Sequence, residues 1–461
     1  MIKVFQEVSS LDKKCYEKYH LSEDLLMEHA AMGLQNALAK ERQKVLIVAG
    51  AGNNGADGIA LARLITSYHD SVLFLPLGTK SPMAKIQEER AKAVGVNTIT
   101  KLEGDYDVVV DCLFGSGLTR ALDEKIQALL RQLNEMKCYK VACDIPTGIS
   151  LEGKQVPEPF IADVTITMGA YKEVLFLDEV KDYVGEIKVV NLGVEASLYA
   201  GESQTFVLEK SDMKLPHRYL QNTHKGSFGH VAVVAGEKQG AGILAAKAAL
   251  SFGVGLVSVL TDKSHNVPYE LMTTTTLPKT TTAVCIGMGL GKVYEDASLS
   301  EFLYHDKALL VDADLFYDPI MIDVLKRKNL LLTPHPKEFV SLLKMTKIAD
   351  IDIETLQKKR FFYGREFSKK FPNVTLLLKG ANTLIIKNGR MFIQPFGSSV
   401  LSKGGSGDVL AGFLASLLAQ GYAPLDAAIT GSLAHALSLK NFNKNSYALT
   451  PNDLIEGVKC L

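Results

Sequence analysis

Two glycine-rich stretches, far apart along the chain, carry the residue types that could perform chemistry. The first, Gly50–Gly58 (GAGNNGADG), contains the spacing G-x-G-x-x-G directly after an apolar run. The second, Gly404–Asp408 (GGSGD), opens a long apolar stretch of helical composition. Glycines permit tight turns and let a phosphate approach the backbone N–H groups at the start of a helix. Both stretches therefore predict sites for ligands that carry phosphate.

The first stretch differs from an ordinary dinucleotide-binding loop. Asn53 and Asn54 fill its intervening positions and Asp57 follows, while the next apolar run ends without the acid that would bind a ribose hydroxyl. Two later apolar runs end in Asp111 and Asp144. Because the carboxyl ends of parallel strands meet at one edge of a sheet, these side chains should converge there. Their oxygen atoms suit a hard cation and not zinc; the alternative for the asparagines is a simple helix cap.

Asp408 stands in the first turn of the helix that the second stretch opens. A carboxylate beside backbone N–H groups that hold an anion is the arrangement that phosphoryl transfer to a hydroxyl needs. The alternative is an acid that only complements the helix dipole. Three other apolar runs lead to Asp312, to His335 between two prolines, and to Lys379–Thr383 (KGANT). The spacing G-x-x-x-x-G-K-[ST] does not occur, which excludes a P-loop enzyme.

Short apolar runs that alternate with helical runs must position these groups. Apolar runs such as Val164–Met168 and Ala308–Val311 recur over residues 45–191 and again over 231–378, with helical stretches such as Gly58–Ser67 between them. A hairpin with Asn388 and Gly389 at its turn follows. Short, continuously apolar strands separated by helices predict parallel sheets that are covered on both faces. We therefore expect an α/β protein.

A polar segment, 195–224, separates the two patterns, so we place a domain boundary near residue 205. The length of 461 residues suits two α/β domains, here 1–205 and 206–461. Apolar residues make up 47% and charged residues 22%, which is typical of a globular protein and excludes disorder. The formal net charge is +0, so no nucleic-acid partner is expected.

Cysteine spacing and the apolar stretches bear on the location of the protein. No two of the six cysteines have CxxC spacing, which argues against a zinc site or a redox pair, and Cys112 and Cys143 are expected as buried free thiols. The N-terminal residues lack the apolar core of a signal peptide. The most apolar stretch, 240–260, includes Lys247 and several glycines, so no membrane span is expected. The predicted location is the cytoplasm.

The first half of the chain resembles the NAD(P)H-hydrate epimerase family over about residues 1–200. The family pattern G-x-G-N-N-G-G-D-G corresponds to Gly50–Gly58, D-x-x-F-G-x-G to Asp111–Gly117, and D-x-P-S-G to Asp144–Gly148. The resemblance implies a Rossmann-like, three-layer α/β domain.

The resemblance also implies roles for individual residues. Asn54, Asp111 and Thr147 would hold a K⁺ ion, and Asp144 would be the acid or base at the epimerised carbon. Thr147 keeps the hydroxyl of the family's serine, whereas Ala56 replaces a glycine and would restrict the loop if that position needs a positive φ. The implied substrate contacts are Asn53, Asn54, Gly55, Ala56, Asp57, Gly115, Ser116, Gly117, Leu118, Thr119, Arg120, Ala121 and Asp144.

The second half resembles the ribokinase-like fold and, within it, the ADP-dependent NAD(P)H-hydrate dehydratase family, over about residues 224–410. The supporting residues are His224–Val231 (HKGSFGHV), Gly240–Leu250 (GAGILAAKAAL), Gly287–Gly291 (GMGLG), the His335-Pro segment, Lys379–Thr383 and Gly404–Asp408. Lys337 stands where the family usually has glycine, and Ser406 where it usually has threonine. The implied substrate contacts are Ala241, Gly289, His335 and Asp408. The implied nucleotide contacts are Lys379, Gly380, Ala381, Asn382, Thr383, Gly404, Gly405, Ser406 and Gly407.

Together the resemblances imply a bifunctional enzyme that repairs hydrated nicotinamide nucleotides. The first domain would interconvert the R and S epimers of NADHX and NADPHX. The second would dehydrate the S epimer to NAD(P)H with ADP and Mg²⁺, with Asp408 activating the ring hydroxyl, and would release AMP and phosphate. Because this fold family often assembles, we expect a homo-oligomer. The sequence does not decide between NADHX and NADPHX or between ADP and ATP.

Two alternatives remain open from the sequence. The ribokinase-like domain could be an ATP-dependent kinase of a small alcohol such as a hydroxymethylpyrimidine or a thiazole. The N-terminal domain could be a binding or dimerisation module without chemistry, although Asn54, Asp111 and Asp144 argue against this.

Overall fold

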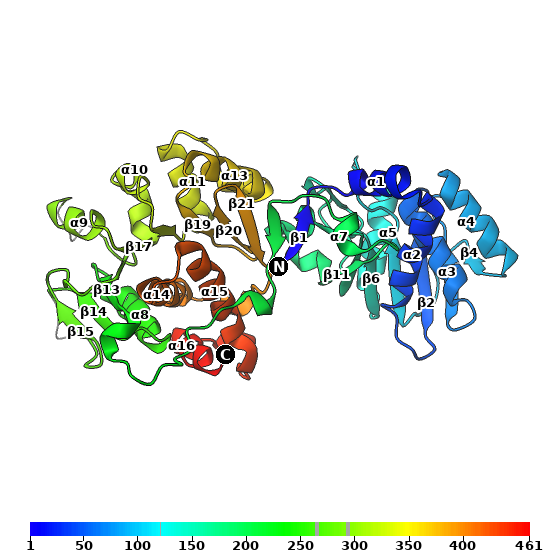
Figure 1. Ribbon diagram of the computed structural model, residues 1–461. Helices are drawn as coiled ribbons and strands as arrows, with labels where there is room; N and C mark the ends of the chain where they lie inside the picture. Colours follow the sequence, from blue (N-terminus) through cyan, green and yellow to red (C-terminus); the bar gives the residue numbers. More distant parts are fainter. Residues whose placement is uncertain (120, 263–266, 292–295) are drawn as a thin grey trace. The chain divides into compact units, whose positions relative to one another are not determined.

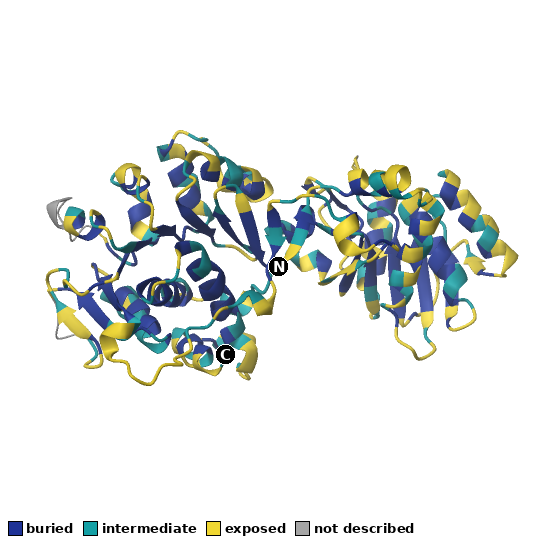
Figure 2. Ribbon diagram, in the orientation of Figure 1, coloured by how far each residue is buried: buried dark blue, intermediate teal, exposed yellow. Residues whose placement is uncertain are grey.

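The computed structural model describes residues 1–119, 121–262, 267–291 and 296–461. Its chain divides into two compact units, Lys3–Ser203 and Gln204–Leu461 together with Met1–Ile2 (Figure 1). Each unit contains its own sheet with helices on both faces, so the expected α/β class with two domains is confirmed. Figure 2 shows that the strands of both sheets are largely buried.

The N-terminal domain is built on a seven-stranded sheet in which every neighbouring pair of strands is parallel. The strand order is β11-β9-β6-β5-β2-β3-β4, so the order reverses between β2 and β5. In an open α/β sheet a ligand crevice forms at the carboxyl ends of the strands at such a reversal. The strands are β2 (Lys44–Ala49), β3 (Asp70–Phe74), β4 (Asn97–Ile99), β5 (Val108–Cys112), β6 (Tyr139–Cys143), β9 (Val164–Met168) and β11 (Glu186–Val190).

Helices cover both faces of this sheet, which confirms the three-layer arrangement. In β2, Val45 and Ile47 pack in one cluster with α1 to α4, whereas Leu46 and Val48 pack in the other with α5. This division follows from the alternation of side chains along a strand. The helices are α1 (Ser9–Tyr19), α2 (Glu23–Gln35), α3 (Asn53–Ile65), α4 (Pro82–Ala93) and α5 (Glu124–Glu135), and the smaller elements are β1 (Ile2–Phe5), β7 (Ile149–Ser150), β8 (Gly153–Lys154), β10 (Tyr171–Lys172), α6 (Lys181–Val184) and α7 (Ala196–Tyr199).

Helix α3 begins earlier than the sequence pattern suggests. A helix is expected from about Gly58, but the structure starts it at Asn53, with Gly52 as the N-cap residue. Asn53, Asn54 and Asp57 therefore project from the first turns of a helix and not from a flexible loop. Gly50, before them, marks a close approach to the next strand end, since a Cβ there would lie 1.9 Å from the carbonyl oxygen of Leu113.

Gly55 marks a close approach of two backbones, and its replacement should destabilise the domain. A Cβ at Gly55 would lie 1.8 Å from the carbonyl oxygen of Gly50. We expect Gly55→Ala to lower the free energy of unfolding by about 1–3 kcal/mol because the backbone must move. Gly117→Ala is the control, since a Cβ there would meet nothing within 4 Å. Calorimetry of the full chain checks this, and equal melting temperatures for the two variants would contradict it.

The C-terminal domain has a larger sheet, ordered β12-β21-β20-β19-β18-β17-β16-β13-β14-β15. Its strands are parallel from β19 to β15, while β20 is antiparallel to both of its neighbours. Asn388 (φ 47°) and Gly389 (φ 76°) form the turn of the expected hairpin. The strands are β12 (Thr205–Val207), β13 (His230–Val234), β14 (Leu256–Leu260), β15 (Met272–Thr274), β16 (Ala283–Ile286), β17 (Ala308–Val311), β18 (Leu330–Leu332), β19 (Thr375–Leu378), β20 (Thr383–Lys387) and β21 (Arg390–Gln394).

Helices also lie on both faces of the second sheet. Ile385 of β20 belongs to the core shared with α8, α14, α15 and α16, whereas the neighbouring Ile386 packs against Gly364 of α13. The helices are α8 (Gln239–Ser251), α9 (Asp296–Leu303), α10 (Met321–Val324), α11 (Pro336–Met345), α12 (Ile353–Lys358), α13 (Arg360–Lys370), α14 (Ser406–Ala419), α15 (Pro424–Leu437) and α16 (Pro451–Gly457). Within the described ranges, no helix combines the length and apolarity needed to cross a bilayer. Cys112 and Cys143 are buried free thiols, as expected.

Candidate active sites

A cavity of ≈ 580 Å³ opens at the carboxyl ends of the N-terminal strands. Helix α3 contributes Asn53, Asn54 and Asp57 to its lining, the loop after β5 contributes residues 115–119, and Asp144 follows β6. This is the reversal of strand order between β2 and β5, so the expected convergence of three strand ends is found. The remaining lining residues are Val8, Asp12, Ala51, Gly52, Leu77, Lys80, Leu113, Phe114 and Met168.

Asp144 is held in one orientation through both of its carboxylate oxygens. Oδ1 accepts hydrogen bonds from Lys172 Nζ at 2.6 Å and from Met168 N at 3.3 Å, and Oδ2 accepts one from Ser116 N at 3.2 Å. The backbone of Asp144 is left-handed, with φ 68°. Such strain is uncommon outside glycine and is concentrated at functional sites.

Lys172 is a site residue that the sequence analysis did not identify. Its side chain is fully buried, and besides Asp144 it donates hydrogen bonds to Thr167 Oγ1 at 2.8 Å and Met168 O at 3.2 Å. Burial acts to raise the pKa of Asp144, but the charge of Lys172 and the hydrogen bonds outweigh it and hold this pKa below its usual value. Asp144 is therefore ionised at neutral pH. The available signal was a lysine shortly after β9, at the same edge of the sheet.

The loop after β5 packs directly against Asn54 and Asp144. A Cβ at Gly115 would lie 2.8 Å from Asn54 Oδ1 and 3.1 Å from Asp144 Oδ2, so a larger residue would disturb both. The neighbouring Asn53 is held from another direction, because its Nδ2 donates to Glu23 Oε1 at 2.6 Å. The two asparagines thus have different partners and different surroundings.

Asp111 and Thr147 form a buried pair beside this loop. Thr147 donates from its backbone N to Asp111 Oδ2 and from its Oγ1 to Asp111 Oδ1, both at 2.8 Å. Burial raises the pKa of Asp111 to about 6, against the hydrogen bonds from Thr147 and Leu113. Among the described residues, none of the groups bonded to this carboxylate is a positively charged side chain.

These residues fit a hard cation. The Nδ2 of Asn54 is buried and has no hydrogen-bond partner in the described part of the chain. The orientation of an amide is assigned from its hydrogen bonds, so the amide oxygen can take the same position. A buried carboxylate without a counter-charge, a hydroxyl and an unpartnered amide together provide oxygen ligands of the kind that alkali and alkaline-earth ions prefer.

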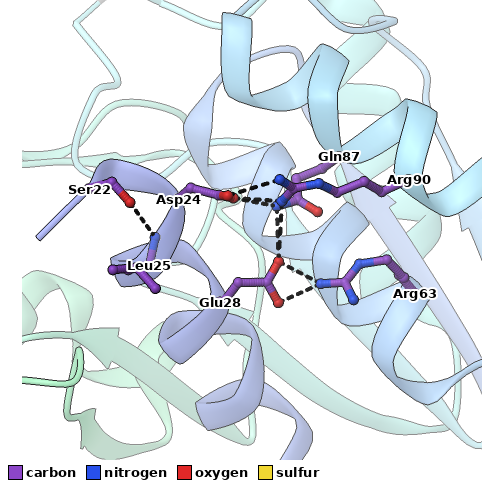
Figure 3. A network of polar contacts seen from close by, with 7 residues as sticks. All are labelled: Ser22, Asp24, Leu25, Glu28, Arg63, Gln87 and Arg90. Carbon is purple, nitrogen blue, oxygen red and sulfur yellow. Dashed lines mark hydrogen bonds and ion pairs between the residues drawn. The ribbon is translucent and has the colours of Figure 1, made fainter.

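A polar network holds α3 against its neighbours (Figure 3). Glu28 of α2 accepts a hydrogen bond from Arg63 Nη2 of α3 at 2.6 Å, and Asp24 of α2 accepts one from Arg90 Nη1 of α4 at 2.6 Å. Gln87 Nε2 lies between them, 3.3 Å from Glu28 Oε1 and 3.4 Å from Asp24 Oδ1. The network fixes the helix whose first turns carry the asparagines and the aspartate of the cavity.

Some of the residues that are expected to contact substrate do not line this cavity. Gly55 and Ala56 are buried within α3 and do not line the cavity. Ala56 does not have a positive φ, so the glycine of the family is not needed there for backbone reasons. Ala121 lines an adjacent cavity of ≈ 200 Å³ that shares Leu77 and Phe114 with the first. Arg120 lies outside the described residues.

In the C-terminal domain, the ends of β17, β18 and β19 bring together a cluster of charged groups. Lys379 Nζ donates to Asp312 Oδ1 at 2.8 Å and lies 4.0 Å from Glu338 Oε2. His335 Nε2 lies 3.0 Å from Glu338 Oε1. Asp408, in the first turn of α14, interacts electrostatically with Asp312 and Lys379 and completes the cluster.

Lys379 stays protonated in this cluster, and the carboxyl groups of Asp408 and Glu338 hold their protons to higher pH than usual. Burial and the charge of Asp312 raise the pKa of Asp408, and Lys379 opposes them only in part. Burial also raises the pKa of Glu338, to about 7. Burial acts to lower the pKa of Lys379, but Asp312 and Glu338 outweigh it and the pKa is raised. A base near a fixed cation is what phosphoryl transfer to a hydroxyl requires.

Glu338 is a second residue that the sequence analysis missed. It shares a capping box at the start of α11 with His335: His335 N donates to Glu338 Oε2 at 2.7 Å, and Glu338 N donates to His335 Nδ1 at 3.2 Å. The signal was the three-residue spacing between a helix-capping side chain and an acid. Lys337, the departure from the family pattern, is exposed in the same helix and leaves this arrangement intact.

The glycine loop before α14 is anchored on its inner side. Gly405 has φ 90°, and Ser406 turns its hydroxyl toward the buried His435, with 3.2 Å between Oγ and Nε2. Burial lowers the pKa of His435 to about 4, so this imidazole is neutral. A Cβ at Gly407 would lie 3.8 Å from Lys379 Nζ. An anion at this loop would therefore meet both the start of α14 and the lysine.

Ala241 and Gly289, the other two expected substrate contacts, lie next to each other. A Cβ at Gly289 would lie 3.3 Å from the Cβ of Ala241, so these two residues are adjacent. Of the expected nucleotide contacts, Gly380, Ala381 and Gly404 are exposed. Asn382 is buried, and Thr383 is partly buried at the start of β20. Contact of these residues with nucleotide stays a prediction.

Comparisons with known protein families give one match within each of the two units of the chain. The family model described as NAD(P)H-hydrate dehydratase matches residues 231–459, and the one described as YjeF-related protein N-terminus matches residues 23–174. The first match confirms the expected ribokinase-like class of the C-terminal domain, and the second agrees with the Rossmann-like class of the N-terminal domain.

Curated proteins match over the whole length. The bifunctional NAD(P)H-hydrate repair enzyme of Helicobacter pylori is 45% identical over 100% of both chains. That of Dictyoglomus turgidum is 32% identical over 98% of this chain and 96% of its own. Among solved structures, an ADP/ATP-dependent NAD(P)H-hydrate dehydratase from Bacillus subtilis, co-crystallized with ATP/Mg²⁺, is 25% identical with a TM-score of 0.45 and covers 53% of this chain and 92% of its own. The full-length identity and the two family matches agree: the chain belongs to the family of bifunctional NAD(P)H-hydrate repair enzymes.

Proposed function

We propose that the chain converts hydrated nicotinamide nucleotides back to NAD(P)H, with epimerisation in the N-terminal domain and ADP-dependent dehydration in the C-terminal domain. One observation carries the proposal: each domain places a carboxylate beside a lysine at the carboxyl ends of its strands. Asp144 and Lys172 do so at the N-terminal cavity, and Asp408 and Lys379 do so at the glycine loop.

The first reaction inverts one carbon of the reduced ring. Water adds to the enamine of a dihydronicotinamide at the carbon next to nitrogen, so the hydrate is a carbinolamine whose C–O bond can break and re-form. Asp144 is held ionised by Lys172 and accepts the proton of the incoming water. K⁺ held by Asn54, Asp111 and Thr147 would neutralise the buried carboxylate and steady the loop of Gly115 beside the substrate.

The second reaction turns the ring hydroxyl into a better leaving group. Asp408 accepts the hydroxyl proton while the oxygen attacks the β-phosphorus of ADP, and AMP departs. The phosphate ester then loses inorganic phosphate and a proton from the adjacent carbon, which forms the double bond of NAD(P)H. Lys379 and the N–H groups at the start of α14 stabilise the charge on the transferred phosphoryl group. Mg²⁺ would enter with the nucleotide.

Recovery of NADH absorbance from a mixed-epimer NADHX pool tests both activities at once. With ADP we expect complete recovery in two phases, because the S epimer reacts directly and the R epimer must first be inverted. Replacing K⁺ by Li⁺ should slow only the second phase. Recovery that stops at the S fraction would identify a non-catalytic N-terminal domain. No recovery, together with ATP consumption on a small alcohol, would establish the kinase alternative.

The proposal includes a cytoplasmic location and assembly into a homo-oligomer. The unbonded cysteines fit a reducing compartment. Light scattering of the purified chain measures the assembly, and a monomeric mass would contradict it.

A further inference from the structure

The N-terminal cavity contains three carboxyl groups in its lining, and they differ in what surrounds them. Asp144 is bonded to Lys172 and to backbone N–H groups, as described above. Asp12 Oδ1 accepts a hydrogen bond from the hydroxyl of Tyr199 at 2.8 Å. In the described part of the chain, the carboxyl group of Asp57 has no hydrogen-bond or ion-pair partner. Asp57 thus lines the cavity, and its carboxyl oxygens are available to a bound ligand.

The surroundings of Asp57 disfavour its ionised form. Burial raises the pKa of Asp57 well above its usual value, and the charges of Asp144, Asp12 and Glu23 raise it further. Among the described residues, no cation contributes to this shift, and Lys80 is a lysine of the cavity lining. The titratable groups that interact with Asp57 are Asp12 and Tyr16 of α1, Glu23 of α2, Cys112 of β5, Cys143 of β6, and Asp144.

We propose that Asp57 is the proton donor of the epimerase site and works with Asp144 as the proton acceptor in the same cavity. Two carboxyl groups whose surroundings separate their protonation states are the usual arrangement for an acid–base pair. Asp144 has a lysine and backbone donors, whereas the described residues provide no such partner for Asp57. The inference rests on the epimerase activity proposed above and assigns the partner that Asp144 needs.

The step balances without any further reactant. Asp57 gives its proton to the ring hydroxyl, the C–O bond breaks, and water leaves while the nitrogen lone pair forms an iminium ion. A water molecule adds to the opposite face of that carbon, and its proton goes to Asp144. The proton then returns from Asp144 to Asp57 through solvent, and the ring carbon has inverted. The donor must be neutral and the acceptor ionised in the same enzyme form.

Asp57→Asn in the full chain tests the assignment. The amide keeps the size of the side chain but cannot supply an acidic proton, so kcat for epimerisation should fall by about 10²–10⁴-fold. KM should change little. In the wild type, kcat/KM should decline at high pH as Asp57 loses its proton, and this basic limb should disappear in the variant. Asp105→Asn, at an exposed position of the same domain, is the matched control and should retain the wild-type rate and pH profile.

Three readouts separate this role from a structural one. ADP-dependent dehydration of pure S epimer by the same variant shows that the chain is folded. The infrared difference spectrum, wild type minus Asp57→Asn at neutral pH, should contain a protonated carboxyl band, because the bands of other protonated carboxyl groups such as Glu338 cancel. In ¹⁸O-labelled water, wild-type epimerisation should place ¹⁸O in the ring hydroxyl faster than the uncatalysed reaction.

The inference is overturned if Asp57→Asn retains epimerisation within threefold, if its only defect is a higher KM, or if the infrared difference spectrum lacks the protonated carboxyl band. It is also overturned if the basic limb disappears in Asp12→Asn instead, since that result would identify Asp12 as the donor. A wild type that does not epimerise at all would contradict the proposed function itself, which is a separate result.

Discussion

Asp408→Asn should abolish ADP-dependent dehydration and leave epimerisation unchanged. The side chain has a pKa raised by burial and by Asp312, it interacts with Lys379, and it stands at the glycine loop. Asparagine keeps the size and the helical position but cannot accept the hydroxyl proton. A general base contributes about 10²–10⁴-fold to a rate, so a loss of that size in kcat is expected. NADH formation from pure S epimer measures dehydration, and R-to-S conversion measures epimerisation.

A matched control separates catalysis from the helix dipole. Asp426 occupies the first turn of α15 as Asp408 does that of α14, but it is half-exposed and away from the cluster. Asp426→Asn should therefore leave both activities intact. Dehydration that survives Asp408→Asn would contradict the assignment of the base. Loss of both activities in Asp408→Asn would show a folding defect.

Lys172→Met should have the second-largest effect and should act through Asp144. Removing one partner of a buried ion pair typically costs about 3–5 kcal/mol, because the remaining charge is left unpaired. Lys172 and the hydrogen bonds now hold the pKa of Asp144 below its unfolded value. Without the lysine, burial dominates and this pKa rises. Epimerisation at neutral pH should fall, and the acidic limb of its pH profile should move to higher pH.

The effect on stability has a definite sign. In the wild type, the lowered pKa of Asp144 contributes stability that is present above the unfolded pKa and is lost as pH falls through the folded one. In Lys172→Met the raised pKa reverses this contribution, so the variant should be least stable, relative to the wild type, at neutral and alkaline pH. Lys188→Met, at an exposed lysine of β11, is the control and should change neither quantity. A loss of stability that is equal at all pH values, or an unmoved acidic limb, would contradict the role of Lys172.

The fold was largely predictable from the sequence because apolar runs and turn residues, which indicate strands and hairpins, are local features of the chain. Continuous apolar runs such as Val164–Met168 and Ala308–Val311 coincide with strands, and the Asn388-Gly389 turn adopts the expected conformation. The predicted start of α3, Gly58, was too late, because glycine and asparagine are typical of loops and the contacts that favour a helix at Asn53 are not visible in the sequence. The edge strand β4 was also missed, because a short, mostly exposed strand has no apolar run.

The sequence by itself determined that Asp111, Asp144 and Asp312 stand at strand ends, and that Asp408 stands in the helix opened by the second glycine stretch. It could do so because in a parallel sheet the carboxyl ends of the strands share one edge, whatever the packing. Only the tertiary structure decided the charge states. Lys172 reaches Asp144 from a strand end 28 residues later, and Lys379 reaches Asp312 across 67 residues. Proton affinity depends on burial and on neighbours within a few ångströms, and sequence spacing does not report either.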